Sequence, residues 1–199
     1  MSTLLKHKDC RRNFRMECIK NCQKCGLCCN QKPMLDCMDC MKECQVFWVG
    51  LSAKMAMSEY EIPLSPETNT GKVIQSIEET LEEVNTYRTN LVKCVPLNEQ
   101  RKLRYPSKKE MDCCFENLQK EISMLSPKIV FLLGEKVTSS VEKHLGIKFE
   151  EWDEFNYQSR EHKGTYYVPV HHPSYIYVYK RKMIEQYAQG IRKVVMSLL

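Results

Sequence analysis

Short apolar runs alternate with amphipathic stretches from Gln45 to the end of the chain. Each run is bounded by glycine, proline or polar residues, which is the pattern of a strand buried in a sheet. Four strands are predicted, at 46–49, 89–94, 128–133 and 166–170. Apolar residues that recur every three or four positions predict amphipathic helices over 73–84, 111–125, 137–145 and 180–199. Ser107 and Glu110 form a capping-box pattern that begins the second of these helices, and Pro127 ends it.

This order of elements predicts an α/β fold with a parallel central sheet and helices on both faces. In open sheets of this kind, binding sites form in the crevice at the carboxyl ends of the strands. The loops after Gly50, Gly134 and Val170 and the strand end at 90–94 reach that edge. Functional residues are therefore expected there.

Cysteine is concentrated near the start of the chain: nine of the twelve lie within residues 10–44. We therefore expect a cysteine-rich, metal-binding segment over 1–44 and an α/β domain over 45–199. The first residues lack the pattern of an export signal, and no apolar run is long enough to span a membrane. In a reducing compartment such as the cytoplasm, clustered cysteines bind metal more often than they form disulfides, with inert thiols as a third alternative. Two sets have the short spacings of zinc or iron–sulfur ligands: Cys22, Cys25 and Cys28, and Cys37, Cys40 and Cys44.

The formal net charge of +5 is unevenly distributed. Residues 1–44 carry a net charge of +4, residues 45–159 a net charge of −4, and residues 160–199 a net charge of +5. If the two ends of the chain fold close together, they form one basic face suited to a polyanion.

Two polar features of the α/β part are candidates for chemistry. His171 and His172, before Pro173, follow the last predicted strand, where a histidine can donate to an oxyanion or a base carbonyl or can simply be structural. Asn90 lies in an otherwise apolar strand; its amide matches the edge of a pyrimidine, or it satisfies loop backbone groups. The sequence has no P-loop, nucleophile elbow or G-x-G-x-x-G motif.

Five short segments form one pattern when they are taken together. They are Cys22-Gln-Lys-Cys25-Gly-Leu27, Tyr87-Arg-Thr-Asn-Leu-Val-Lys-Cys94 with Pro96, Cys114, Ser126-Pro-Lys-Ile-Val-Phe-Leu-Leu-Gly134 and Val168-Pro-Val-His-His-Pro-Ser-Tyr175. In order and spacing they resemble the iron–sulfur uracil-DNA glycosylases, type 4 and its relative type 5, whose motifs include Y-x-T-N-x-V-K-C-x-P and V-P-T-x-H-P-S-Y. The resemblance covers roughly residues 22–180.

The resemblance implies a metal centre and a catalytic residue. A [4Fe–4S] cluster would be held by Cys22, Cys25, Cys94 and Cys114, with Cys113 as the nearest competitor for the last place. His172 would stabilise the negative charge that develops on a departing base. The remaining cysteines suggest a second site for zinc, on Cys37, Cys40, Cys44 and one of Cys28 or Cys29, or they are bystanders.

The resemblance also implies contacts to DNA from which the target nucleotide is flipped out. The base would be bound by Asn90, Leu51, Ser52 and Tyr60. The DNA would be held by Ser174, Tyr175, Lys180 and Arg181.

The chain departs from the type-4 pattern at two places. The first motif, G-E-x-P-G, corresponds to Gly50-Leu-Ser-Ala-Lys54, which has no acid, like the G-L-A-P start of type 5. The aromatic residue of P-F-V-G is absent from Pro63-Leu-Ser-Pro66, and Tyr60 is the candidate substitute. We therefore expect catalysis by leaving-group stabilisation, with water placed by Asn69 or a glutamate of the same loop.

The expected protein is a monomeric, monofunctional DNA glycosylase. Its substrate is uracil or another modified or damaged base, including a modified base in foreign (phage) DNA. No lysine is placed for a Schiff-base mechanism, although Lys54 and Lys72 are alternatives. The rival hypotheses are a catalytically inactive nucleic-acid-binding module of the same fold and a zinc-rich interaction protein.

Overall fold

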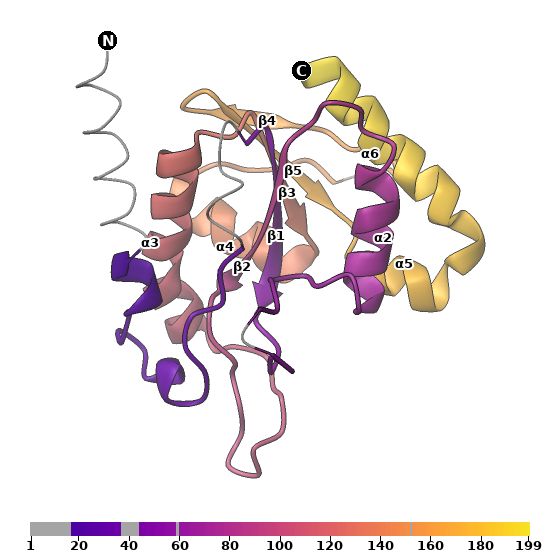
Figure 1. Cartoon of the computed structure of the whole chain (residues 1–199). Helices are drawn as coiled ribbons and strands as arrows, with labels where there is room; N and C mark the ends of the chain where they lie inside the picture. Colours follow the sequence, from indigo (N-terminus) through magenta and orange to yellow (C-terminus); the bar gives the residue numbers. More distant parts are fainter. Residues whose placement is uncertain (1–16, 37–43, 59, 152) are drawn as a thin grey trace, which may run out of the picture.

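The computed structural model describes residues 17–36, 44–58, 60–151 and 153–199. In these residues a five-stranded sheet has the strand order β2-β1-β3-β5-β4 (Figure 1). The strands are β1 (Val46–Ser52), β2 (Thr86–Val92), β3 (Ile129–Leu133), β4 (Arg160–His162) and β5 (Thr165–Val170). All pairings are parallel except that of β4, which lies antiparallel to β5 at one edge.

Helices cover both faces of this sheet (Figure 1). They are α2 (Asn69–Glu78), α3 (Lys108–Leu125), α4 (Glu135–Leu145), α5 (Pro173–Tyr179) and α6 (Ile184–Leu198), with short 3-10 turns η1 (Leu27–Cys29) and η2 (Arg181–Met183). The helices α3 and α4 pack on one face, and α2, α5 and α6 pack on the other. The predicted α/β class is confirmed.

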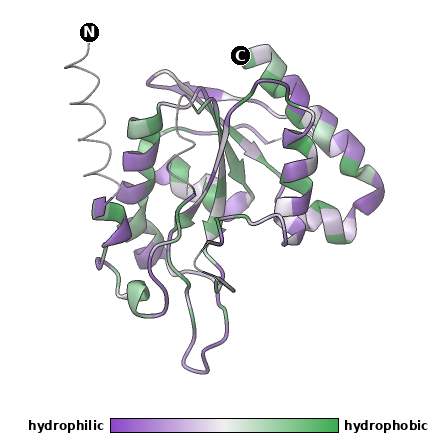
Figure 2. Ribbon diagram, viewed as in Figure 1, coloured by the Kyte–Doolittle hydropathy of each residue, from purple (hydrophilic) through white to green (hydrophobic). Residues whose placement is uncertain are grey.

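Two apolar layers result, because successive residues of a strand point to opposite faces. Phe47 belongs to the layer under α3 and α4, whereas Trp48 belongs to the layer under α2 and α6. Both side chains are completely buried. Figure 2 shows the same arrangement, with apolar strands in the centre and helices that carry both apolar and polar residues.

Several predicted boundaries shift. The strand β1 continues through Gly50 to Ser52, and β2 begins at Thr86 because it pairs with β1 over that whole length. The helix α2 ends at Glu78, before the predicted end at Val84. The capping box is confirmed: the Ser107 hydroxyl accepts from the Glu110 amide, and the Glu110 carboxylate accepts from the Ser107 amide.

The predicted start of the helix over 180–199 is wrong. The backbone of Lys180 leaves the helical region, with φ −128° and ψ 36°, so α5 ends before it and α6 begins after η2. The separate helix α5 begins at Pro173, and proline is common at the first helical position.

The described part of the N-terminal segment packs beside α3 (Figure 1). Ile19 and Leu27 are buried in the layer that contains Leu118. Most of the positive charge of the N-terminal segment belongs to residues 1–16, which lie outside the described residues, so the single basic face considered above stays a prediction. Within the described ranges, none of the helices has the length and apolar character that crossing a bilayer requires.

Candidate functional site

A cavity of about 940 Å³ opens at the carboxyl ends of the parallel strands. Its wall is formed where each strand ends, by Leu51, Ser52, Asn90, Gly134, His171 and His172. This is the edge at which the sheet topology predicts a binding site.

His172 is held in one tautomer at the end of β5. Its Nδ1 accepts a hydrogen bond from the backbone N–H of Ser174 (3.3 Å) and lies 2.8 Å from the Ser174 hydroxyl oxygen. Because a backbone N–H only donates, Nδ1 carries no proton, and the neutral ring carries its proton on Nε2. Burial, and then the positive charge of Lys54, lower the pKa of His172. The site therefore holds a neutral imidazole that can donate from Nε2.

Asn90 lies on β2 and is almost fully buried, but its side chain reaches the cavity wall. Its amide makes no hydrogen bond to another described residue, so donor and acceptor are both available to a ligand. A Cβ at Gly50 would lie 2.4 Å from the Asn90 Oδ1 atom and 2.7 Å from the Leu64 Cδ2 atom. Only glycine at position 50 lets these two side chains meet at the wall.

Behind Asn90 lies a buried ion pair between Lys93 and Glu121, both completely inaccessible to solvent. The Lys93 ammonium also donates to the Asn90 carbonyl oxygen and to the Thr89 hydroxyl (2.7 Å). The Glu121 carboxylate accepts from the hydroxyls of Tyr87 (2.9 Å) and Thr89 (3.1 Å). Burial, and then the nearby Glu121, raise the pKa of Tyr87, so its hydroxyl remains a donor. This network fixes the strand that carries Asn90.

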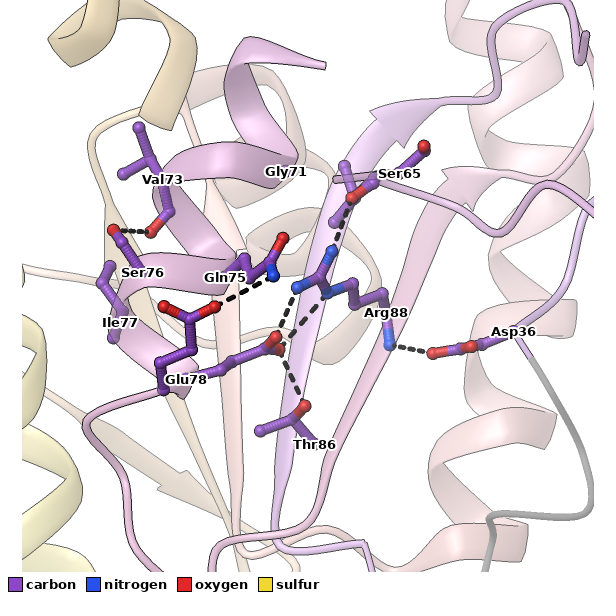
Figure 3. A network of polar contacts seen from close by, with 12 residues as sticks. Asp36, Ser65, Gly71, Val73, Gln75, Ser76, Ile77, Glu78, Thr86 and Arg88 are labelled. Atoms are coloured by element: carbon purple, nitrogen blue, oxygen red, sulfur yellow. Dashed lines mark hydrogen bonds and ion pairs between the residues drawn. The ribbon is translucent and has the colours of Figure 1, made fainter. Parts of the chain in front are cut away.

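A second network fixes the loop that precedes α2 (Figure 3). The Arg88 guanidinium pairs with both oxygens of Glu78 on α2 and donates to the Leu64 carbonyl (2.9 Å). The backbone N–H of Arg88 donates to the Asp36 carboxylate. The loop comes so close to α2 that a Cβ at Gly71 would lie 1.9 Å from the nearest loop carbonyl oxygen. Strand, helix and loop are therefore locked together beside the cavity.

The structure divides the predicted site residues into two groups. Lining the cavity are His172, Asn90, Leu51, Ser52, Ser174 and Tyr175. Lys180 and Arg181 follow α5 and lie outside the lining, with the Arg181 guanidinium 5.1 Å from the centre of the Tyr177 ring. Tyr60 is 85% exposed, and Asn69 is exposed on the first turn of α2; neither lines the cavity. Next to Asn69, the side chains of Thr68 and Thr70 do line it.

Two further lining residues had been considered only as alternatives, Lys54 for a Schiff base and Glu61 as a glutamate that places water. The Glu61 Oε2 atom accepts from the Met57 amide (2.7 Å). Met34, Tyr105 and Lys136 also line the cavity and were not predicted. No sequence signal distinguishes Met34 and Tyr105 from other positions, because they reach the cavity through loops whose paths the sequence does not reveal.

The four predicted cluster cysteines approach one another from three parts of the chain. Burial raises the pKa of the Cys94 thiol, as do the neighbouring thiols of Cys114, Cys25, Cys28 and Cys22, in that order. The Asn117 amide donates to Cys22 Sγ (3.3 Å) and to Cys114 Sγ (3.8 Å). The Lys93 backbone N–H also donates to Cys114 Sγ (3.4 Å). Donors to sulfur of this kind stabilise thiolate ligands.

Four cysteine sulfurs are the ligand set of a [4Fe–4S] cluster, and Cys22, Cys25, Cys94 and Cys114 supply such a set. Within the described ranges, no group of three or more His, Cys, Asp or Glu side chains is arranged to hold one metal ion. A four-iron cluster needs a wider set of sulfurs, because its irons stand between the cysteines. Cys114 is the better fourth ligand than Cys113, since only Cys114 is buried and receives hydrogen bonds at its sulfur from described residues.

The second metal site finds no support in the described residues. Cys37 and Cys40 lie outside them. The Cys44 thiol is buried beside the start of β1, where it donates to the Val46 carbonyl (3.3 Å). Burial raises the pKa of this thiol to about 12, so it stays protonated. Cys28 lies near Cys94, which follows the carboxyl end of β2. Cys44 precedes the start of β1, at the opposite end of the sheet. Among the described cysteines there is no disulfide.

The N-terminal segment connects the thiols to the cavity. The Asn30 amide donates to the Val95 carbonyl (2.8 Å), and the Met34 N–H donates to the Lys93 carbonyl (2.8 Å). Gln31 accepts from the Ala56 N–H (2.7 Å) in the loop after β1. Residues 30–34 therefore hold the segments that follow β1 and β2 next to the cavity.

Comparison with known proteins agrees with this geometry. The sequence pattern of the Uracil DNA glycosylase superfamily matches residues 43–195. The type-4 uracil-DNA glycosylase of Sulfurisphaera tokodaii is 28% identical over 137 residues, which are 64% of this chain and 60% of that relative. The chain thus spans less than two thirds of that relative's length. The crystal structure of SMUG2 from Pedobacter heparinus has a TM-score of 0.57 at 13% identity, over 79% of this chain and 76% of that one, and so shares the fold.

Proposed function

Because the chain belongs to the uracil-DNA glycosylase superfamily, we propose that it is a monofunctional DNA glycosylase. It would hydrolyse the N-glycosidic bond of uracil or another modified or damaged base that is flipped out of DNA, including a modified base in foreign DNA. The neutral His172 in the cavity wall is the observation that carries this proposal. We propose that one chain acts alone and that it works in a reducing compartment such as the cytoplasm.

His172 acts on the leaving group. As the glycosidic bond breaks, its electron pair moves into the base and negative charge collects on a carbonyl oxygen of the base. The Nε2–H of a neutral imidazole donates to that oxygen and stabilises the transition state more than the ground state. The fixed tautomer and the lowered pKa of His172 support this role, because the donor needs no reorientation at the moment of reaction.

A water molecule attacks the sugar carbon that loses the base. The segment that follows Gly50 offers no carboxylate, but Glu61 lines the cavity. One of its oxygens is held by the Met57 amide, so the other is free to accept a proton from water. We propose Glu61 in place of Asn69, because Asn69 lies outside the cavity wall.

The base and the DNA are bound on either side of this reaction centre. The Asn90 amide, which makes no hydrogen bond to another described residue, reads the edge of the base, with Leu51 and Ser52 beside it. Ser174 and Tyr175, at the start of α5, contact the flipped nucleotide, and Lys180 and Arg181 hold phosphates further along.

We propose that Cys22, Cys25, Cys94 and Cys114 hold a [4Fe–4S] cluster, which these donors fit. When bound, the cluster supplies a cross-link between the N-terminal segment and the strand end after β2. Residues of that segment, Asn30 and Met34, then keep the cavity wall in place.

The proposal is tested by a base-release screen on oligonucleotides that carry uracil, hypoxanthine or modified cytosines. Wild type is expected to release at least one of these bases, and His172→Ala is expected to lower kcat by about 10²–10³-fold. His162→Ala is the matched control, because His162 lies on the edge strand β4 and does not line the cavity. Full activity of His172→Ala would show that the assigned role is wrong.

One observation favours a second candidate, an inactive DNA-binding module of the same fold. The segment after Gly50 has lost the acid of the type-4 motif. If wild type binds DNA but releases none of the bases, this candidate replaces the first.

Borohydride reduction during the reaction tests the monofunctional route: a trapped covalent adduct, lost in Lys54→Arg, would identify a lyase instead.

A further inference from the structure

The loop between β2 and α3 extends away from the body of the molecule (Figure 1). Two large apolar side chains near its end are exposed, Leu103 at 51% and Tyr105 at 73%. Exposed aromatic side chains beside a cavity need an explanation, because solvent contact with apolar surface is unfavourable. The proposed chemistry at His172 does not use residues 97–105 of this loop.

The loop is nevertheless built as an ordered element. Leu97 and Leu103 form an antiparallel bridge across it. The Arg104 guanidinium binds both oxygens of Glu110 (2.6 and 2.8 Å) at the start of α3 and also donates to the carbonyls of Leu97 and Tyr105 (3.0 Å each). The Arg104 guanidinium is the first cause that lowers the pKa of Glu110 to about 2, so this pair stays charged at neutral pH. Tyr105 is therefore presented in a defined position.

Tyr105 faces the cavity together with a cation. Leu103, Tyr105 and Lys136 all line the cavity, and the Lys136 Nζ atom lies 5.0 Å from the centre of the Tyr105 ring. An aromatic face with a neighbouring ammonium suits a nucleic-acid base with its phosphate.

The part of the lining that α5 supplies has the same character. On α5, Tyr175 is 42% exposed and Tyr179 is 76% exposed, and their rings lie 5.4 Å apart. Both line the cavity, as does the exposed Val178. Two aromatic rims thus border one opening, whose volume of about 940 Å³ approaches the upper end of the range for a drug-sized ligand.

We propose that the loop over residues 97–105 is a second DNA-contacting rim, on which Tyr105 stacks an unpaired base that flanks the flipped nucleotide. The inference rests on the proposed function. Unpaired DNA is the occupant because bases in a duplex stack on each other and offer no free face to Tyr105, whereas a single strand does. Lys136 and the loop residues Arg101 and Lys102 supply the positive charge that its phosphates require.

The test is binding, not base release. A dye-labelled oligodeoxythymidylate, which contains no excisable base, is titrated with protein at fixed salt and followed by fluorescence anisotropy. Tyr105→Ala is expected to weaken binding by about 5- to 100-fold, the effect of losing one stacked base, while Tyr105→Phe binds like wild type. Lys136→Met is expected to lower the slope of log affinity against log salt by about 0.7.

The chain offers a matched control in Tyr166→Ala. A lysine also lies over the Tyr166 ring, with Lys128 Nζ 5.1 Å from its centre, but Tyr166 is the second residue of β5, at the end of the strand away from His171, and does not line the cavity. This variant should bind like wild type. Unchanged binding by Tyr105→Ala, equal loss in Tyr166→Ala, or no binding by wild type would overturn the inference.

The binding assay and the base-release assay test the rim and the glycosylase assignment independently. If Tyr105→Ala loses binding while wild type releases no base, the rim stands and the glycosylase assignment fails. If wild type releases a base and Tyr105→Ala binds normally, the assignment stands and the rim is wrong.

Discussion

Replacing Lys93 by methionine tests the buried ion pair behind Asn90. Methionine keeps most of the volume of the side chain and removes its charge. In the native protein the Lys93 ammonium contacts the Glu121 carboxylate, the Asn90 carbonyl and the Thr89 hydroxyl, and both charged side chains are 0% exposed. The variant leaves a buried carboxylate without a countercharge and a buried carbonyl without this donor.

The expected loss follows from these contacts. Removing one partner of a buried pair costs about 3–5 kcal/mol of unfolding free energy. Glu121 keeps two hydroxyl donors, from Tyr87 and Thr89, so we expect a value near about 3 kcal/mol. Lys93→Met with Glu121→Gln should recover about 2 kcal/mol of that loss, because a neutral carboxamide still accepts from both hydroxyls without a buried charge.

Urea denaturation of the two single variants, the double variant and wild type gives the interaction free energy directly. Lys120→Met, on α3 like Glu121, is the control. It breaks an exposed pair with Glu116 and should change the unfolding free energy by less than about 0.5 kcal/mol. If Lys93→Met is as stable as wild type, or if the losses of the two single variants simply add in the double variant, the pair does not hold this strand as argued.

Three further predictions concern the site. Cys94→Ser should lose the brown colour and the absorbance near about 400 nm of an iron–sulfur protein, whereas Cys18→Ser, at an exposed cysteine, should keep both in an absorption spectrum of purified protein. Glu61→Gln should lower kcat in the base-release assay by about 10²–10⁴-fold, and Glu67→Gln, on the exposed side of the same loop, should not. Because burial lowers the pKa of His172, its neutral form persists as pH falls to 6.5, so kcat/KM should decline only below that value; a decline centred above pH 6.5 would contradict the neutral donor.

The sheet could be predicted from sequence because its strands bury both faces. In β3, Ile129–Leu133, all five residues are buried, so the apolar run has the length of the strand. The strand β4 contains only polar and charged residues, Arg160–His162, because it lies at an edge, and apolar patterning cannot reveal it. The strand β2 was placed three residues late, since Tyr87 and Arg88 are buried through partners that are distant in sequence.

Within the site, residues at strand ends were predictable and residues on loops were not. His172 and Asn90 line the cavity because strand direction and sheet order put them there. Asn69 misses it because neighbouring positions of a helix point about 100° apart, which turns Asn69 outward. Tyr105 lines the cavity on a loop that the Arg104–Glu110 pair ties to α3, an interaction between residues that no local pattern connects.

One strand and its continuation connect the thiols to Asn90, the side chain that we propose reads the base. Asn90 reaches the cavity, Lys93 holds the Asn90 carbonyl from behind, and Cys94 contributes a thiol. The Lys93 N–H also binds the sulfur of Cys114. Because these contacts fall within five consecutive residues, the strand cannot shift at one of them without moving the others. We therefore expect loss of the cluster and loss of the Lys93 charge to act alike, raising KM by displacing Asn90, whereas loss of the His172 donor acts on kcat.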